Sequence, residues 1–129
     1  MPEFELSTTL ARSVLPQQVS RGDAIYNISH GALVLKALEK GDETLLLRAM
    51  QDRLHQNYRK QLIADYPEIE ALVRTLGAPL CLSGAGPTLL CITQNPRVEP
   101  ILREKLPTIA KKSWQILPLH VEFQGAHVV

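Results

Sequence analysis

The residues best suited to chemistry in this sequence gather in three short stretches. The first is LSGAGPT, in which Gly84 and Gly86 stand between two apolar runs. Glycine permits positive φ and has no Cβ to keep a ligand away from the main chain. Successive backbone N–H groups in such a turn can bind anionic oxygens, and Ser83 and Thr88 add hydroxyl groups. The stretch therefore indicates either an ordinary Gly/Pro turn or a main-chain surface that approaches a substrate.

The second stretch is QDRLHQNYR, which contains Asp52, His55 and Arg59. We expect a helix here, and spacings of three and four residues then place these side chains on one face. Such a face is either solvated or turned into a cleft. In a cleft, Arg59 would offer a planar fork to a carboxylate or phosphate, and Asp52 would orient the histidine. The pattern leaves both interpretations open and assigns no catalytic residue.

The third stretch is STTLAR, which places Thr8 and Arg12 directly after an expected first strand. A loop arginine is usually exposed. A second guanidinium close to Arg59 would nevertheless form a two-armed clamp for one anionic group. Whether the two side chains meet depends on the tertiary structure.

The other histidines and cysteines predict no metal site. The three histidines outside these stretches are His30, His120 and His127. Their spacing to one another and to the cysteines is not that of metal ligands. Cys81 and Cys91 lack a CxxC arrangement and are expected to be buried core thiols in a reducing compartment. Asn27 lies inside an expected helix, where it is either exposed or supports a polar site.

Length and composition predict one domain of an ordinary globular protein. The chain has 129 residues, of which 45% are hydrophobic and 21% charged, with a formal net charge of +1. This balance gives no argument for nucleic-acid binding. The N-terminus lacks the pattern of a signal peptide, and no apolar run approaches the roughly 20 residues of a membrane span. We therefore expect a cytoplasmic protein.

The elements that must position these residues follow from periodicity and turn signals. We expect a strand over 3–9, helices over 23–39 and 43–58, a helix from 65 to 77, strands over 79–82 and 89–93, a helix over 95–107 and a closing strand over 113–123. The order β-α-α-α-β-β-α-β predicts an α+β, ferredoxin-like sandwich. It would have an antiparallel four-stranded sheet with helices packed on one face.

Apolar stripes and capping residues define how the helices should pack. Asp23 is expected to cap the first helix and Gly41 to end it. Its inward stripe is predicted to be Ile25, Ile28, Ala32, Leu35 and Leu38. The stripe of the second helix is predicted to be Leu46, Met50 and Leu54. Asp65 followed by Pro67 and Glu68 predicts a capped start of the third helix, and Pro107 an end of the last.

These stretches also resemble a known family. LSGAGPT is similar to the third signature motif of the GHMP kinases. Together with STTLARSVLP, DAIYNISHGALVLKAL and MQDRLHQNYR, it resembles the homoserine kinases in particular. The resemblance runs in the family's order and spacing from about Glu5 to the closing VEFQGAHVV.

The resemblance implies ATP- and Mg²⁺-dependent phosphorylation of the side-chain hydroxyl of L-homoserine, in threonine biosynthesis. It implies that Arg12 and Arg59 bind the homoserine carboxylate and that Thr8 lies near the reacting hydroxyl. It also implies that Gly84 and Gly86 approach the substrate. The residues expected to support this site, without a defined chemical role, are Asp52, His55 and Ser83.

One departure from the family limits what this chain is expected to do. Homoserine kinases are considerably longer, and their N-terminal domain carries the glycine motifs that wrap the ATP phosphates at a helix N-terminus. Neither motif occurs in this sequence. We expect the C-terminal domain alone, without the ATP-binding domain, inactive by itself, and with an uncovered surface through which it could form homo-oligomers. The alternatives are a non-enzymatic ferredoxin-like module for amino-acid binding or dimerisation, and a GHMP kinase with another small acceptor.

Overall fold

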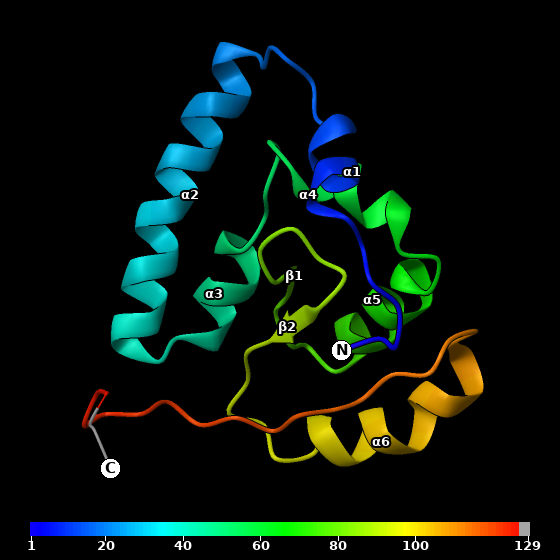
Figure 1. Ribbon diagram of the computed structural model, residues 1–129. Helices are drawn as coiled ribbons and strands as arrows, with labels where there is room; N and C mark the ends of the chain where they lie inside the picture. Colours follow the sequence, from blue (N-terminus) through cyan, green and yellow to red (C-terminus); the bar gives the residue numbers. More distant parts are fainter. Residues whose placement is uncertain (127–129) are drawn as a thin grey trace.

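The computed structural model describes residues 1–126, so His127 lies outside the described residues. The elements are α1 (Thr8–Ser13), α2 (Arg21–Lys40), α3 (Glu43–Ala49), α4 (Gln56–Arg59), the 3₁₀ turn η1 (Lys60–Leu62), α5 (Tyr66–Thr75), β1 (Leu80–Leu82), β2 (Leu89–Cys91) and α6 (Val98–Ile109). A hairpin of β1 and β2 lies at the centre, with α2 and α3 on one side and α5 and α6 on the other (Figure 1). The helices thus cover two sides of the hairpin.

The hairpin carries the two strands predicted around the glycine loop, although both are shorter than expected. The strands are antiparallel, with Leu80 opposite Cys91 and Cys81 opposite Leu90. Because side chains alternate along a strand, Leu80 and Cys91 share one face while Cys81 and Leu90 share the other. The two cysteines therefore lie on opposite faces of the hairpin.

Two clusters of buried apolar side chains hold the hairpin against α5 and α6. The first consists of Ile69, Val73, Ala78, Val98 and Leu106, and the second of Ile63, Tyr66 and Leu82. Trp114 packs against both clusters and connects the chain beyond α6 to the core. Leu82, the residue before the glycine loop, is therefore buried in the apolar core.

The N-terminal residues pair with the segment after α6 through one isolated bridge and adjacent main-chain hydrogen bonds. Pro2 pairs with Trp114 in an antiparallel bridge, and the N–H of Glu3 donates to the carbonyl of Ser113 at 3.1 Å. The sheet of the described residues has two strands. The predicted α+β class is confirmed, but a four-stranded sheet is not. The predicted strands over 3–9 and 113–123 are both wrong, because within these two ranges only Trp114 takes part in a bridge. Ser7 caps α1 and draws the residues that follow it into a helix.

Helix α2 includes the whole predicted range 23–39, but it begins earlier, at Arg21, and has a different capping residue. Ser20, not Asp23, is the cap, since its Oγ accepts from the N–H of Asp23 at 3.0 Å. Gly41 ends the helix as predicted, with a φ of 63°. No helix within residues 1–126 combines the length and the apolar character needed to cross a membrane.

The predicted inward stripe of α2 is wrong, because it lies on the outer face. The side chains of Ile28 and Leu35 are 77% and 71% exposed, whereas Ala37 is 1% exposed. Small residues such as Ala37 let α3 pack closely against the other side of α2. Apolar residues occur on both faces of this helix, so periodicity alone did not indicate which one turns inward.

The predicted helix over 43–58 is broken into α3 and α4. Helix α3 ends at Ala49 and α4 begins at Gln56, with a loop between them. The carboxylate of Asp52 accepts main-chain N–H bonds inside this loop, which offers the backbone an alternative to the helical ladder. Asp52, His55 and Arg59 therefore do not share one helical face, and that expectation is corrected.

Two residues that were predicted to mark helix ends, Asp65 and Pro107, do not do so in the structure. Asp65 precedes α5 but makes no side-chain capping bond. Its carboxylate accepts instead from the N–H groups of Lys111 and Lys112 at 2.8 and 3.1 Å. Pro107 lies inside α6 and does not end it. The Asp65 side chain thus serves a long-range contact where the sequence predicted a local one.

Candidate functional site

The glycine loop closes the hairpin and keeps part of its main chain available. The N–H of Ser83 donates to the carbonyl of Thr88 at 2.8 Å, and the N–H of Gly86 donates to the carbonyl of Ser83 at 3.1 Å. Among the described residues, the N–H groups of Gly84 and Ala85 have no main-chain acceptor. An anionic group that approached this loop would therefore be bound by those two N–H groups.

Gly84 and Gly86 meet different requirements. Both have positive φ, 60° and 84°, where an L side chain is strained. A Cβ on Gly84 would meet nothing within 4 Å, so the main chain there is open to a ligand. A Cβ on Gly86 would lie 3.5 Å from Ile63 and 3.6 Å from Leu82. The Cβ position of Gly84 is therefore open, whereas that of Gly86 faces the core. The approach of both glycines to a substrate stays a prediction.

Arg59 ties the glycine loop to α1. Its Nε donates to the carbonyl of Ala11 at 3.0 Å, and its Nη1 donates to the carbonyl of Gly84 at 3.3 Å. The side chain is half-buried, not part of a solvated polar face. Its Nη2 makes no hydrogen bond to the described residues, so this nitrogen retains its donor capacity.

Asp52 holds the loop that leads into α4. Its Oδ2 accepts from the N–H groups of Leu54, His55 and Gln56 at 3.1, 2.7 and 2.6 Å. Its Oδ1 accepts from the side-chain amide of Asn27 at 2.6 Å. The loop is therefore fixed both locally and to α2. Asn27 supports a polar cluster and is not simply an exposed helix residue.

The protonation of Asp52 follows from these contacts. Burial by itself raises the pKa of its carboxyl, but the N–H donors of Gln56 and His55, the Asn27 amide and the nearby His55 ring outweigh it. The pKa of Asp52 therefore lies below its ordinary value. The carboxylate is thus stabilised in its charged form by the donors that fix this loop.

His55 connects Asp52 with Arg59. Its Nδ1 lies 3.5 Å from Nη1 of Arg59, and its Nε2 lies 3.7 Å from Oδ1 of Asp52. The chain of contacts from Asp52 to Arg59 positions the guanidinium beside the glycine loop.

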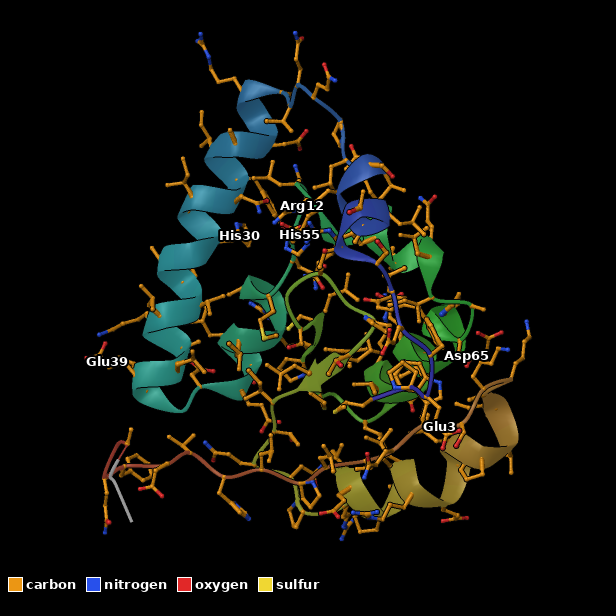
Figure 2. All side chains as sticks on the ribbon, in the orientation of Figure 1. Glu3, Arg12, His30, Glu39, His55 and Asp65 are labelled. Atoms are coloured by element: carbon orange, nitrogen blue, oxygen red, sulfur yellow. The ribbon has the colours of Figure 1, made fainter. Side chains whose placement is uncertain are left out.

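Thr8 and Arg12 lie on α1 and are exposed. The bond from Arg59 to the carbonyl of Ala11 brings the main chain next to Arg12 against α4. Figure 2 shows Arg12 and His55 in the space between α1 and α2. The structure thus brings the backbone of these stretches together. A clamp formed by both guanidinium groups stays a prediction.

Gln56 is a supporting residue that sequence reasoning missed. Its Oε1 accepts from the N–H of Leu82 at 2.8 Å, one residue before the loop begins. Asn27 makes a comparable link, since its Oδ1 accepts from the N–H of Arg53 at 2.9 Å. Each of these bonds joins residues 26 apart in the chain. No local pattern signals them.

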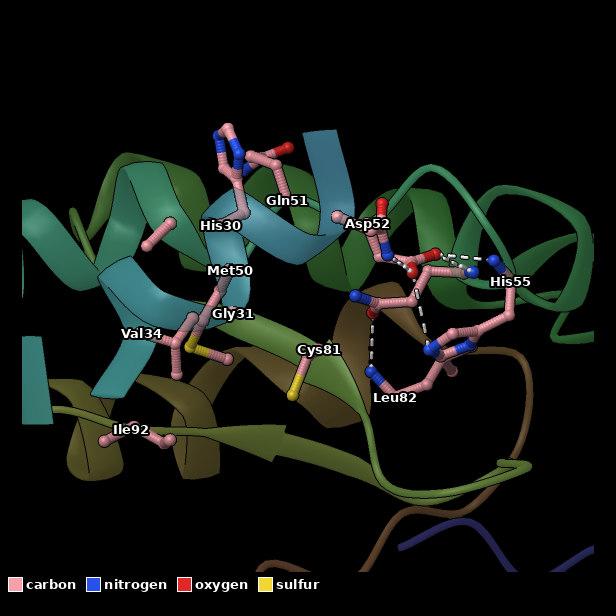
Figure 3. A pocket seen from close by; sticks show the side chains of 13 residues that line it. His30, Gly31, Val34, Met50, Gln51, Asp52, His55, Cys81, Leu82 and Ile92 are labelled. Carbon is pink, nitrogen blue, oxygen red and sulfur yellow. Dashed lines mark hydrogen bonds and ion pairs between the residues drawn. The ribbon is translucent and has the colours of Figure 1, made fainter. Parts of the chain in front are cut away.

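A cavity of about 350 Å³ lies between α2 and the hairpin (Figure 3). Its lining includes Val34, Met50 and Ile92 at one end and Asp52 and His55 at the other. The apolar end lies against α2 and the end of β2. At the polar end, Asp52 already accepts the hydrogen bonds described above. His55 borders both this cavity and Arg59, so the cavity adjoins the candidate site.

The remaining titratable groups add no metal centre to the site. Within residues 1–126 no group of three or more His, Cys, Asp or Glu side chains could hold a metal ion. His30 stacks on Tyr26, with ring centroids 3.6 Å apart. Cys81 and Cys91 are half-buried, a correction to the expected full burial, and neither forms a disulfide. Burial raises both thiol pKa values, that of Cys91 to about 11 with a further contribution from Glu43.

Known proteins resemble this chain along nearly its whole length. It is 47% identical over 122 residues to a homoserine kinase of Synechococcus sp., covering 94% of this chain and 38% of that protein. It is 40% identical to a homoserine kinase of Crocosphaera subtropica, covering 99% of this chain and 42% of the relative. The chain therefore spans less than half the length of these relatives.

A solved structure and a family pattern agree with the observed fold. The crystal structure of homoserine kinase from Cytophaga hutchinsonii superposes with a TM-score of 0.75 at 24% identity. It covers 82% of this chain, which covers 34% of it. Residues 34–112 match the family described as GHMP kinases C terminal. The fold around the hairpin and this match together show that the chain belongs to the GHMP kinase C-terminal family.

Proposed function

We propose that this chain is the acceptor-side domain of a homoserine kinase, which transfers the γ-phosphoryl group of ATP to the side-chain hydroxyl of L-homoserine. The observation that carries the proposal is the 47% and 40% identity to proteins named homoserine kinase over at least 94% of the chain. The reaction belongs to threonine biosynthesis. A cytoplasmic location stays a prediction from the sequence.

The residues of this chain would bind and orient the acceptor. Phosphoryl transfer depends mainly on positioning and on electrostatic stabilisation. Arg59 and Arg12, which directly follows the Ala11 carbonyl that Arg59 binds, would bind the homoserine carboxylate. Thr8 would lie near the reacting hydroxyl, and the N–H groups of Gly84 and Ala85 would meet anionic oxygens. Asp52 and His55 would hold Arg59 in place.

ATP and Mg²⁺ would be held by residues outside this chain. A nucleotide-bound Mg²⁺ needs hard oxygen ligands, commonly carboxylates. The described residues contain no suitable cluster, and the lowered pKa of Asp52 reflects bonds to its own loop. We therefore assign no Mg²⁺ ligand to the described residues and derive no step through the metal.

A chimera tests the proposed reaction. We expect that replacing the matching 38% of the Synechococcus relative with this chain yields an enzyme that releases ADP only with both ATP and homoserine. Activity should stay within about 100-fold of the parent, since a misplacement of about 1 Å costs that much. Serine, threonine and mevalonate serve as competing acceptors. A folded chimera that prefers another acceptor would instead support a different GHMP kinase.

The chain alone should bind no Mg·ATP. Isothermal titration up to about 1 mM nucleotide should show no saturable heat, because the proposed nucleotide site is absent. The chimera provides the positive control under the same conditions. A micromolar dissociation constant for the isolated chain would contradict the proposed division of the site.

A further inference from the structure

Gln56 connects two elements of the candidate site. It is the first residue of α4 and is half-buried. Its main-chain N–H donates to Oδ2 of Asp52 at 2.6 Å, and its Oε1 accepts from the N–H of Leu82 at 2.8 Å. The main chain of Gln56 is therefore held by the Asp52 loop, while its side chain holds the end of β1.

The N–H of Leu82 needs an acceptor from outside the hairpin. The N–H of Ser83, the next residue, donates across the hairpin to the carbonyl of Thr88. Because successive residues of an antiparallel strand alternate between bonding to the partner strand and pointing away from it, the N–H of Leu82 points away from β2. Leu82 is 5% exposed, and a buried N–H without an acceptor is costly. Gln56 supplies this acceptor from 26 positions away in the chain.

The donors proposed to bind the acceptor lie close to this contact along both parts of the chain. On α4, Arg59 follows Gln56 by about one helical turn. On the hairpin, Gly84 follows Leu82 after Ser83 alone. Nη1 of Arg59 donates to the carbonyl of Gly84 at 3.3 Å and joins the two parts again. The bond from Leu82 to Gln56 thus closes a ring of contacts, which fixes the guanidinium relative to the glycine loop.

We propose that Gln56 is a positioning residue for the acceptor, because it keeps the N–H groups of the glycine loop and the guanidinium of Arg59 within reach of one anionic group. The inference rests on the proposed function and adds to it a residue that acts through β1 and α4, without contact with the substrate. Donors from two elements bind one carboxylate only at the correct spacing, and a misplacement of about 1 Å can cost about 100-fold in rate.

Gln56→Met in the chimera tests the proposal. Methionine keeps a long unbranched side chain but has no oxygen to accept from the N–H of Leu82. We expect the KM for homoserine to rise about 10-fold and the KM for ATP to stay unchanged, because only the acceptor side loses its alignment. Partial unfolding alone would lower the apparent kcat through loss of active enzyme and leave both KM values unchanged. Steady-state kinetics with each substrate varied in turn distinguishes the two.

Gln56→Glu and Gln61→Met are the matched variants. Glutamate keeps an oxygen acceptor on a side chain of the same length, so its KM for homoserine should lie between those of the parent and Gln56→Met. Gln61 is exposed, and its Nε2 donates to the nearby carbonyl of Asn57 at 3.1 Å. Gln61→Met removes a glutamine that does not reach the hairpin, and it should change neither KM value.

Amide hydrogen exchange of the 129-residue chain, followed by NMR, checks the contact without the reaction. The N–H of Leu82 should exchange at least about 10-fold faster in Gln56→Met, and at the parent rate in Gln61→Met. A chimera without homoserine-dependent activity would contradict the proposed function, and the role of Gln56 with it. In an active chimera, an unchanged homoserine KM in Gln56→Met would overturn the role of Gln56 alone. So would unchanged exchange at Leu82, or a glutamate variant no better than the methionine one.

Discussion

Asp65→Ala is expected to lower the free energy of unfolding of this chain by about 4 kcal/mol. Asp65 is 1% exposed, and its carboxylate accepts from the N–H groups of Lys111 and Lys112 and from Nε1 of Trp114 at 2.9 Å. Alanine would leave these part-buried donors unpaired, at about 1–3 kcal/mol each. Urea unfolding followed by the fluorescence of Trp114, the single tryptophan, measures the change.

Asp42→Ala is the matched control for Asp65→Ala. Asp42 is exposed and accepts one bond, from the N–H of Leu45 at 2.8 Å, as the cap of α3. Its replacement should cost about 1 kcal/mol. Equal losses for the two variants would contradict the long-range role of Asp65. Asp65→Asn, which keeps one acceptor, should be intermediate and provides a folded variant if the alanine form does not fold.

The Asp65 contribution should also depend on pH. Burial raises the pKa of its carboxyl, but the bonds from Trp114, Lys111 and Lys112 and the charge of Lys111 outweigh this, so the folded-state pKa is lowered. A lowered folded-state pKa adds stability above the unfolded value of about 3.9 and loses it as pH falls through the folded one. The stability difference from Asp65→Asn should therefore shrink below about pH 4. A constant difference would contradict this assignment.

Arg59→Ala, in an active protein such as the chimera, should raise the homoserine KM about 100-fold and leave the KM for ATP unchanged. Charge-assisted bonds between a guanidinium and a carboxylate contribute about 1.5–3 kcal/mol. The lost tie from Arg59 to the carbonyls of Ala11 and Gly84 would add misplacement of the glycine loop. Steady-state kinetics with each substrate varied in turn provides the measurement.

Two further variants distinguish a role of Arg59 in substrate binding from a purely structural role. Arg59→Lys keeps the charge but not the fork, and should raise the homoserine KM by a smaller factor of about 10. Arg48→Ala removes an exposed arginine from α3 and should change neither KM. An unchanged homoserine KM in Arg59→Ala would remove this residue from the acceptor site. If Arg59→Ala lowered the melting temperature and changed both KM values equally, Arg59 would have only a structural role.

Local signals in the sequence predicted the central hairpin and the extent of α2. Gly84 and Gly86 adopt the positive φ that their loop requires, and the strands on either side alternate as expected. Gly41 ends α2 through the same property. These features depend on residues a few positions apart, so short patterns are enough to predict them.

Most features of the fold that local patterns did not predict depend on contacts between residues far apart in the chain. Asp52 interrupts a predicted helix because its carboxylate accepts three nearby N–H groups while Asn27 on α2 holds its other oxygen. Asp65 has the sequence position of a cap, yet it binds a segment 46 residues away. Apolar periodicity on α2 did not distinguish its inner face from its outer one.

The sequence by itself determined the residue types of the candidate site and the family they resemble. Glycines for a close turn, and arginine forks for an anion, are properties of the side chains alone. Only the tertiary structure decided that Arg59 meets both α1 and Gly84, and that Gly84 is open where Gly86 faces the core. Such placement depends on packing between elements far apart in the chain, which no local pattern encodes.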